Sequence, residues 1–305
     1  MTLPLPLESA DELALGHVGR LGKWCGAKSR NEVFEALRER IGIRGTGVTP
    51  ALHAVAIACG IQPDQYVGRH SMLPFTCFLV SANLTLGRCA PRWSDPVVSK
   101  IGCLTPLGLP TFCARCALEQ RDRFAYSTWV RTFQLPGTLR CSQHESPLLQ
   151  APDAESFMKQ PSDVYASGRY LTLPARKWSY DHPAIVKFAA CAREMLATSR
   201  SWPGDLVRRR LSQRAELVGL RTSRVGSSPL LSDQAFDTFP IGFLEEFFPV
   251  PTQRTGGLFV PAIDCASIRT SNAPTGVAIA LAMSLLYSSP REALNALTLA
   301  SQLDP

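Results

Sequence analysis

Two short stretches decide how this sequence is interpreted: FCARC at residues 112–116 and CSQH at residues 141–144. Each places two potential ligands three positions apart, so that one tight turn can direct both at the same ion. Three thiolates and one imidazole suit Zn²⁺, which prefers tetrahedral coordination and accepts sulfur ligands. The pattern predicts one zinc ion within a small zinc-finger module, bound by Cys113, Cys116, Cys141 and His144.

The expected zinc site is structural and not catalytic. A catalytic zinc keeps one position open for water, whereas four protein ligands fill the tetrahedron. The sequence contains no HExxH helix and no His-x-Glu pair that would place a general base beside a bound water. We therefore expect a protein that is not an enzyme. A zinc hydrolase whose fourth ligand is labile is the alternative from another class.

The residues around the ligands resemble the TniQ/TnsD family of target-selection proteins from bacterial transposons. In the central region the resemblance rests on the Phe-Cys start, on Tyr126 and Trp129 ahead of Leu135, and on the Cys-x-x-His end. Residues 5–9 are similar to the family's Pro-x-Glu-Ser start, and residues 59–75 to its small helix-turn-helix. The resemblance extends over residues 3 to 150 and fades beyond them.

This resemblance implies a non-catalytic target-site selection subunit of a bacterial DNA transposition system. Its partners would be an AAA+ ATPase regulator that acts with the transposase, and DNA or a CRISPR RNA-guided effector complex. The alternative is a zinc-containing DNA-binding transcription regulator with no transposon partner. The sequence leaves open whether a fixed DNA sequence or a guide RNA sets the target. It also leaves open which surface contacts the ATPase, and the oligomeric state, a homodimer included.

The expected fold is mainly α-helical and has three modules. Residues 1–84 would form a helix-turn-helix-like module, residues 85–150 the zinc-finger module, and residues 151–305 a C-terminal helical module with a basic patch. Within the zinc module, five side chains are expected to pack around the metal-binding turns. They are Phe124, Tyr126, Trp129, Phe133 and Leu135.

Several helix ends are marked by local signals. Ser9 with Glu12, and Ser29 with Glu32, match the capping box that begins many helices. Thr49 and Pro50 predict the start of another helix. Gly60 then predicts a tight turn, and Pro63 the start of a short helix. These last two helices are the expected helix-turn-helix pair.

The second half of the chain alternates between irregular and helical patterns. Residues 85–112 are rich in Gly and Pro and predict loops, and residues 147–174 predict a polar linker. Beyond the linker, the sequence predicts helices over residues 183–196, 203–218, 228–240, 243–248, 275–287 and 289–299.

Charge is unevenly distributed along the chain. Residues 200–228 carry seven arginines against two acids, whereas residues 229–305 carry seven acids against three arginines. A basic helix suits phosphate contacts, and an acidic end suits a protein partner. Leu206, Leu211 and Leu217 are expected to face inward on this helix. The expected nucleic-acid contacts are Arg208, Arg209, Arg210, Arg214, Arg221 and Arg224. The alternative is an ordinary solvated helix face.

The remaining patterns exclude other protein classes. The longest apolar run, residues 277–287, is too short to span a bilayer, and the N-terminus lacks the signal-peptide pattern. The chain is therefore expected to be cytoplasmic and without a membrane partner. His17 and His53 have no acidic or thiol partners in sequence and are expected to be ordinary histidines. Five isolated cysteines are expected to be buried thiols: Cys25, Cys59, Cys77, Cys191 and Cys265.

Overall fold

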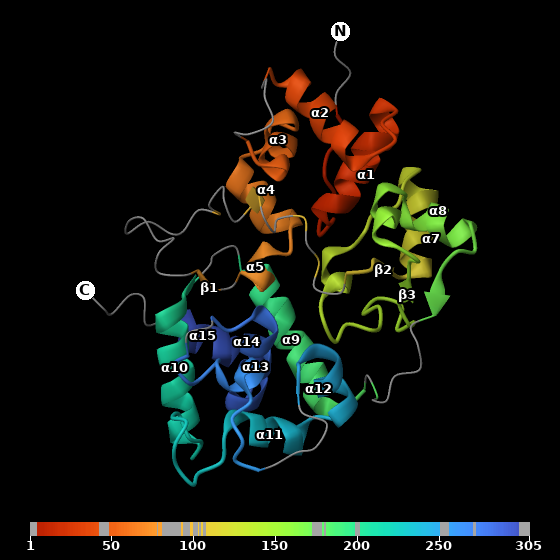
Figure 1. The fold of residues 1–305 in the computed structure, drawn as a ribbon. Coiled ribbons are helices and arrows are strands. Elements are labelled where there is room, and N and C mark those ends of the chain that lie inside the picture. The colour runs from red at the N-terminus through yellow and green to blue at the C-terminus, as the bar shows by residue number, and fades with distance from the viewer. Residues whose placement is uncertain are drawn as a thin grey trace. The chain divides into compact units, whose positions relative to one another are not determined.

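The computed structural model describes residues 5–42, 49–77, 79–80, 93, 98–99, 103, 105, 108–172, 179, 181–198, 202–250, 256–270 and 273–298. These residues are mainly helical, and each strand is only two residues long, which confirms the expected fold class (Figure 1). Residue contacts divide the chain into two compact units. Unit 1 comprises Met1–Leu73 and Arg92–Pro174, and unit 2 comprises Pro74–Pro91 and Ala175–Pro305.

The first four helices belong to unit 1. They are α1 (Ala14–Cys25), α2 (Arg30–Arg40), α3 (Ala51–Ala58) and α4 (Pro63–His70). The Ser29 hydroxyl accepts a hydrogen bond from the Glu32 amide at 3.3 Å, so the predicted cap of α2 is confirmed. The cap of α3 is Pro50, one residue after the expected Thr49. Gly60 makes the predicted turn with a positive φ of 74°. DNA contact by α3 and α4 stays a prediction.

The predicted cap of α1 at Ser9 is wrong, because that helix begins only at Ala14. The Glu12 carboxylate does accept a hydrogen bond from the Ser9 amide at 2.9 Å. However, Glu12 is fully buried, and the Arg20 Nε and Nη2 atoms both donate to its carboxylate at 2.7 Å. The carboxylate is therefore part of a buried ion pair on the inner side of α1.

Close approach of α1 to a later part of unit 1 depends on two glycines. A Cβ atom at Gly16 would lie 2.7 Å from the Trp129 ring, and one at Gly19 would lie 2.2 Å from the Phe157 carbonyl oxygen. Both distances are shorter than side chains tolerate, so only glycine fits at these positions. Trp129 is 1% exposed and packs edge-on against Phe112 and Phe157.

Residues 108–172 complete unit 1 with short elements. The strands β2 (Thr111–Phe112), β3 (Leu149–Gln150) and β4 (Leu171–Thr172) form an antiparallel sheet with β3 in the middle. The helical pieces are α7 (Ala114–Phe124), η2 (Arg131–Gln134), η3 (Ala154–Met158) and α8 (Pro161–Ala166). Within the predicted linker, residues 147–172 are thus part of the folded unit. They fold back on the unit, because η3 packs against α1 and α8 packs against α7.

Unit 2 contains most of the later helices. They are α9 (Pro183–Ala197), α10 (Gly204–Leu217), α11 (Leu231–Thr238), α12 (Ile241–Phe247), α13 (Pro261–Asp264), α14 (Gly276–Leu286) and α15 (Pro290–Thr298). The strands β1 (Leu79–Val80) and β5 (Trp202–Pro203) pair in parallel. The short helix α5 (Leu73–Thr76) contains the point where the chain passes between the units. The helices predicted beyond residue 183 are all present, with ends shifted by a few residues.

Apolar packing forms the core of unit 2. The helix α14 packs against α9, and nine of its residues are buried in a nearly continuous run. Phe188 of α9 packs edge-on against Phe239 and Phe243, whose rings stack on each other at 5.3 Å between centroids. Within the part of the chain that the structure describes, no helix has both the length and the apolar character needed to cross a bilayer.

The structure tests the predicted loop region and the predicted buried cysteines only in part. Most of the loop-rich stretch predicted over residues 85–112 lies outside the described residues. Of the isolated cysteines, Cys191 and Cys265 are buried as expected, but Cys25 is exposed. Cys25 is the last residue of α1, where the helix surface turns away from the core.

Candidate metal centre

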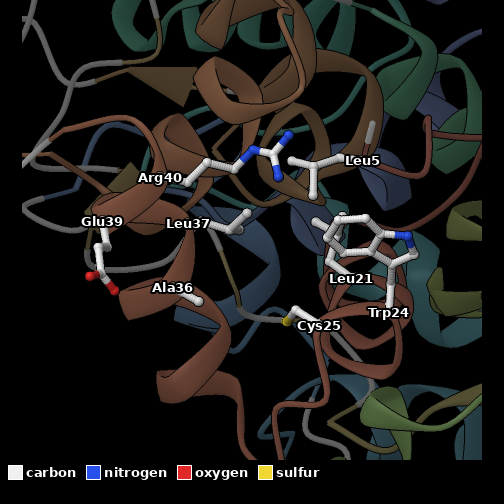
Figure 2. Close-up of a pocket in the computed structure, with 8 residues that line it drawn as sticks. All are labelled: Leu5, Leu21, Trp24, Cys25, Ala36, Leu37, Glu39 and Arg40. Carbon is white, nitrogen blue, oxygen red and sulfur yellow. The ribbon is translucent and has the colours of Figure 1, made fainter. Parts of the chain in front are cut away.

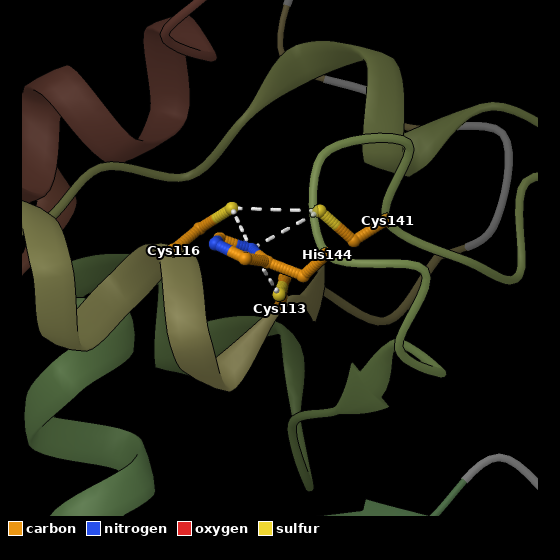
Figure 3. Close-up of side chains that lie close together, drawn as sticks. All are labelled: Cys113, Cys116, Cys141 and His144. Atoms are coloured by element: carbon orange, nitrogen blue, oxygen red, sulfur yellow. Dashed lines mark hydrogen bonds between the residues drawn. The ribbon is translucent and has the colours of Figure 1, made fainter.

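The four predicted ligands come together in unit 1 (Figure 3). One ligand atom from each of Cys113, Cys116, Cys141 and His144 lies within 4.8 Å of all the others. In Figure 3 the three sulfur atoms surround the imidazole ring of His144. This cluster could hold a metal ion, as the spacing in the sequence predicts.

The separations fit one tetrahedral ion. The Nδ1 atom of His144 lies 3.5 Å from the Cys113 sulfur, 3.2 Å from the Cys116 sulfur and 3.6 Å from the Cys141 sulfur. The Cys116 and Cys141 sulfurs are 3.5 Å apart. A tetrahedron with metal–sulfur bonds of about 2.3 Å has edges of roughly 3.8 Å. The side chains are therefore already arranged close to the coordination shell of a zinc-sized ion.

Local structure explains how each pair of ligands is directed inward. Cys113 follows β2 and is the N-cap of α7, and Cys116 lies in the first turn of that helix. Cys141 and His144 lie in a tight turn closed by a hydrogen bond from the Glu145 amide to the Cys141 carbonyl at 2.8 Å. Glu145 has a left-handed φ of 52°, which lets the chain reverse toward β3. A helix start and a turn thus face each other across the ion position.

A carboxylate contacts the imidazole of His144 on the nitrogen that faces away from the sulfurs. The Nε2 atom of His144 lies 2.9 Å from Oε1 of Glu119, which is one turn further along α7 than Cys116. The Nδ1 atom faces the sulfurs, so Nε2 carries the proton and donates to the carboxylate. Metal-binding histidines are commonly oriented in this way by a second group. No role of Glu119 was predicted from the sequence. Its spacing of three residues from Cys116 is the signal that could have found it.

Hydrogen bonding within the cluster distributes the thiol protons unequally. The hydrogen bond with Cys116, together with those from Ser146 and His144, lowers the pKa of the Cys113 thiol. The same contact raises the pKa of the Cys116 thiol. A metal ion requires thiolates, so its binding would release the thiol protons of the cluster.

The apolar support of the cluster is smaller than the sequence predicts. Phe133 and Leu148 pack with the buried Cys113 and Cys141, and Val130 lies beside them. Phe124 is 50% exposed, so its predicted place in this core is wrong. Phe124 is the last residue of α7 and lies on the outer face of the helix.

Two of the expected aromatic residues in this module pack elsewhere. Trp129 packs against α1, and its Nε1 atom donates to the Lys159 carbonyl at 2.8 Å. Tyr126 lies beneath the Arg20 guanidinium, 4.4 Å from the ring centre. The aromatic residues therefore connect the metal-binding region to the first helix.

The predicted nucleic-acid contacts lie on α10 and in the turn after it. The buried face of α10 consists of Val207, Leu211 and Ala215, spaced one helical turn apart. Leu211 therefore faces inward as predicted. Leu217 is 77% exposed, and its predicted inward position is wrong because it falls outside this four-residue spacing.

The six predicted arginines do not form one face. Arg208 and Arg209 line a polar cavity on α10. Arg214 instead donates to the Leu286 carbonyl at 2.9 Å and lies 3.6 Å from the Glu292 carboxylate. Arg221 donates to the Gly226 and Gly257 carbonyls, and the Arg224 guanidinium lies over the Phe259 ring. The Nε atom of Arg210 is buried without a hydrogen-bond partner among the described residues.

A cavity of about 300 Å³ opens between α1 and α2 (Figure 2). Its walls are mainly apolar, with Leu21 and Trp24 from α1 and Leu37 from α2. The Arg40 guanidinium lies 5.9 Å from the Trp24 ring centre at one side.

Two buried histidines of unit 1, His17 and His70, form hydrogen bonds, as predicted for His17. The Nδ1 atom of His17 lies 2.9 Å from the Tyr66 hydroxyl, and its Nε2 atom lies 2.9 Å from the Pro6 carbonyl. His70 Nδ1 lies 2.9 Å from the Glu12 carbonyl. These side chains join α1, α4 and the segment before α1.

No family model matches the chain, and comparison with curated proteins finds no match.

Proposed function

We propose that the cluster of three cysteines and one histidine binds one Zn²⁺ ion with a structural role. The observation that carries this proposal is the convergence of all four ligand atoms within 4.8 Å. Sulfur-rich tetrahedral sites are typical of structural zinc, and a metal of this kind contributes folding energy to a module with a small core. Glu119 supports the same interpretation, because it fixes the His144 ring for coordination through Nδ1.

Metal analysis of the purified chain tests this proposal. We expect about one zinc per chain, and a Cys116→Ser variant with both less zinc and lower stability. Cys25→Ser is the matched control, because Cys25 is an exposed free cysteine outside the cluster. Stoichiometric zinc retained after replacement of both Cys116 and Cys141 would overturn the assignment.

We propose further that the protein is a non-catalytic target-site selection subunit of a bacterial DNA transposition system. It would link target DNA, or a CRISPR RNA-guided effector complex, to an AAA+ ATPase regulator. The motifs shared with the TniQ/TnsD family support this role. The arginine-rich helix α10 supports a nucleic-acid contact, because guanidinium groups neutralise phosphates.

A role without chemistry of its own agrees with the geometry of the metal centre. Four protein ligands leave a tetrahedral ion no position for an activated water. The carboxylate nearest the cluster, Glu119, contacts the outer nitrogen of His144 and so acts on a ligand. Target recognition and recruitment would be the protein's whole contribution, and the transposase would cut elsewhere.

Affinity capture from the native host distinguishes this proposal from its alternative. A tagged full-length chain should recover an AAA+ ATPase, together with DNA or an RNA-guided effector. Recovery of DNA without an ATPase would favour a zinc-containing transcription regulator. A second bait ending near residue 200 locates the ATPase contact. It should still recover the ATPase if residues 3–150, which carry the family resemblance, make that contact.

A further inference from the structure

The polar cavity beside α10 has the features of a built anion site. It measures about 280 Å³ and is lined by Asp205, Arg208, Arg209, Ser212, Thr222, Ser267 and Arg269. The last two residues come from the segment after α13, so the site joins two parts of unit 2 that are far apart in sequence. The lining contains three guanidinium groups against one carboxylate.

Two polar groups in this cavity are buried without a partner among the described residues. Ser267 is 1% exposed, and its hydroxyl has no hydrogen-bond partner there. The Nε atom of Arg208 is likewise unpartnered, and the Arg208 side chain is only 13% exposed. Buried donors without an acceptor are costly, so native proteins nearly always satisfy them. Both residues line the cavity, so a small side-chain rotation would let either donor reach an acceptor bound there.

The acidic groups nearby leave most of the positive charge available. Asp205 lies 3.9 Å from Nη1 of Arg208, a long ion pair, and is 66% exposed at the rim. Glu216 is engaged by the Thr222 hydroxyl, which donates to its carboxylate at 2.6 Å. Arg209 and Arg269 line the cavity at exposed positions. The cavity therefore favours a ligand that is negatively charged.

We propose that this cavity binds a phosphate group. Three guanidinium groups with the Ser212 and Ser267 hydroxyls offer more donors than the two oxygens of a carboxylate can accept, whereas phosphate has more oxygens. Arginine forks also match phosphate geometry. The volume is at the lower end for small-molecule sites, which suits one phosphate with a short attachment. The phosphate belongs either to a small phosphate monoester or to a nucleic-acid backbone. Only the nucleic-acid source rests on the proposed function.

Calorimetric titration of the full-length chain with inorganic phosphate at constant ionic strength tests the site. The pocket variant carries Arg209→Gln and Arg269→Gln, both at exposed positions, so folding is retained. We expect its affinity to fall on the order of 100-fold, since two charge-assisted contacts are lost. The matched control carries Arg193→Gln and Arg291→Gln, which remove the same charge from exposed positions of unit 2 outside the cavity.

Absence of binding to the wild-type chain, or equal weakening in both double variants, would overturn the proposal. A third variant, Ser267→Ala, tests the buried hydroxyl by itself. Its affinity for inorganic phosphate should fall about five-fold, the value of one lost hydrogen bond. An unchanged affinity would mean that water satisfies this hydroxyl, and Ser267 would be removed from the site.

Competition identifies the source of the phosphate. Displacement of inorganic phosphate by a short DNA duplex without terminal phosphates would assign the nucleic-acid backbone. Displacement by ribose 5-phosphate alone would support the pocket and assign a monoester, and it would count against a role of α10 in target DNA binding. Displacement by neither competitor would overturn the assignment to a phosphate-bearing ligand. The metal centre plays no part in these measurements, so the zinc proposal can fail independently.

Discussion

Unit 1 and unit 2 are stabilised by different kinds of contact. In unit 1, buried polar side chains connect separate segments of the unit. Glu12 and Arg20 form a buried ion pair, His17 contacts Tyr66, and Arg131 donates to the Gly68 carbonyl at 2.8 Å. Unit 2 also contains a buried carboxylate, Asp264, which accepts from Ser232. Most of its interior, however, is apolar, with α14 buried along nearly its whole length.

The difference shows that apolar helix packing can stabilise one part of a chain while buried polar contacts stabilise another. Apolar helix packing tolerates many substitutions, since different side chains of suitable size can fill the same space. Buried hydrogen bonds and metal sites tolerate few substitutions, because the loss of one partner leaves the other unsatisfied. We therefore expect unit 1 to respond more sharply than unit 2 to single changes of charge, metal and pH.

Metal removal should produce the largest effect. Structural zinc supplies on the order of 10 kcal/mol of folding free energy in small modules. A chelator should therefore unfold residues 108–150, and hydrogen exchange of their amides should become fast. The amides of α9 and α14 in unit 2 should stay protected. Loss of protection in both units together would show that the chain unfolds as one cooperative body.

Breaking the buried ion pair of unit 1 should produce the second-largest loss of stability. Arg20→Ala leaves the Glu12 carboxylate buried without its charge partner and should cost about 4 kcal/mol. Lys23→Ala is the matched control on the same helix. Its exposed pair with Asp163, at 3.2 Å, should contribute less than about 1 kcal/mol. Urea unfolding followed in unit 1 measures both, and similar costs would contradict the role given to the buried pair.

A cavity in the apolar core of unit 2 should have a somewhat smaller effect. Met283 of α14 is fully buried, and Met283→Ala should cost about 3 kcal/mol. Leu217→Ala removes an apolar side chain that is 77% exposed on α10 and should change stability by less than about 0.5 kcal/mol. Denaturant unfolding followed in unit 2 measures both. Equal costs would mean that α14 is not the core of the unit.

Acid should destabilise unit 1 before unit 2, with the smallest effect of the four. Burial lowers the pKa of His17 and of His70 below the ordinary value of 6.5. The unfolded chain therefore binds more protons near pH 6. This contribution to stability is complete above pH 6.5 and is lost as the pH falls from that value through the lowered pKa of each histidine. Hydrogen exchange at pH 7.5 and 5.5 measures the change.

The zinc content must be measured in the same acid samples, because protonation of the ligands would also release the metal. With the zinc retained, slower loss of protection in unit 1 than in unit 2 would contradict the role given to the two histidines. Equal loss would show that their burial has no net effect on the folded state.

Local patterns in the sequence predicted the features that depend on neighbouring residues. The ligand pairs are three positions apart, so each can be recognised without the rest of the fold, and the structure brings the two pairs together. The cap at Ser29 and the helix starts at Pro63 and Pro183 are local in the same way. The apolar run of α14 predicts a buried helix because no surface position could hold it.

Tertiary structure alone decided which partners these local elements meet. Trp129 was expected beside the metal, yet the absence of a side chain at Gly16 allows α1 to approach it. Glu119 became a partner of His144 only when the turn of residues 141–144 folded onto α7. Ser267 and Arg269 meet Arg208 and Arg209 across more than one helix. Sequence spacing fixes contacts within a turn or a helix, whereas contacts between distant segments depend on how the whole core packs.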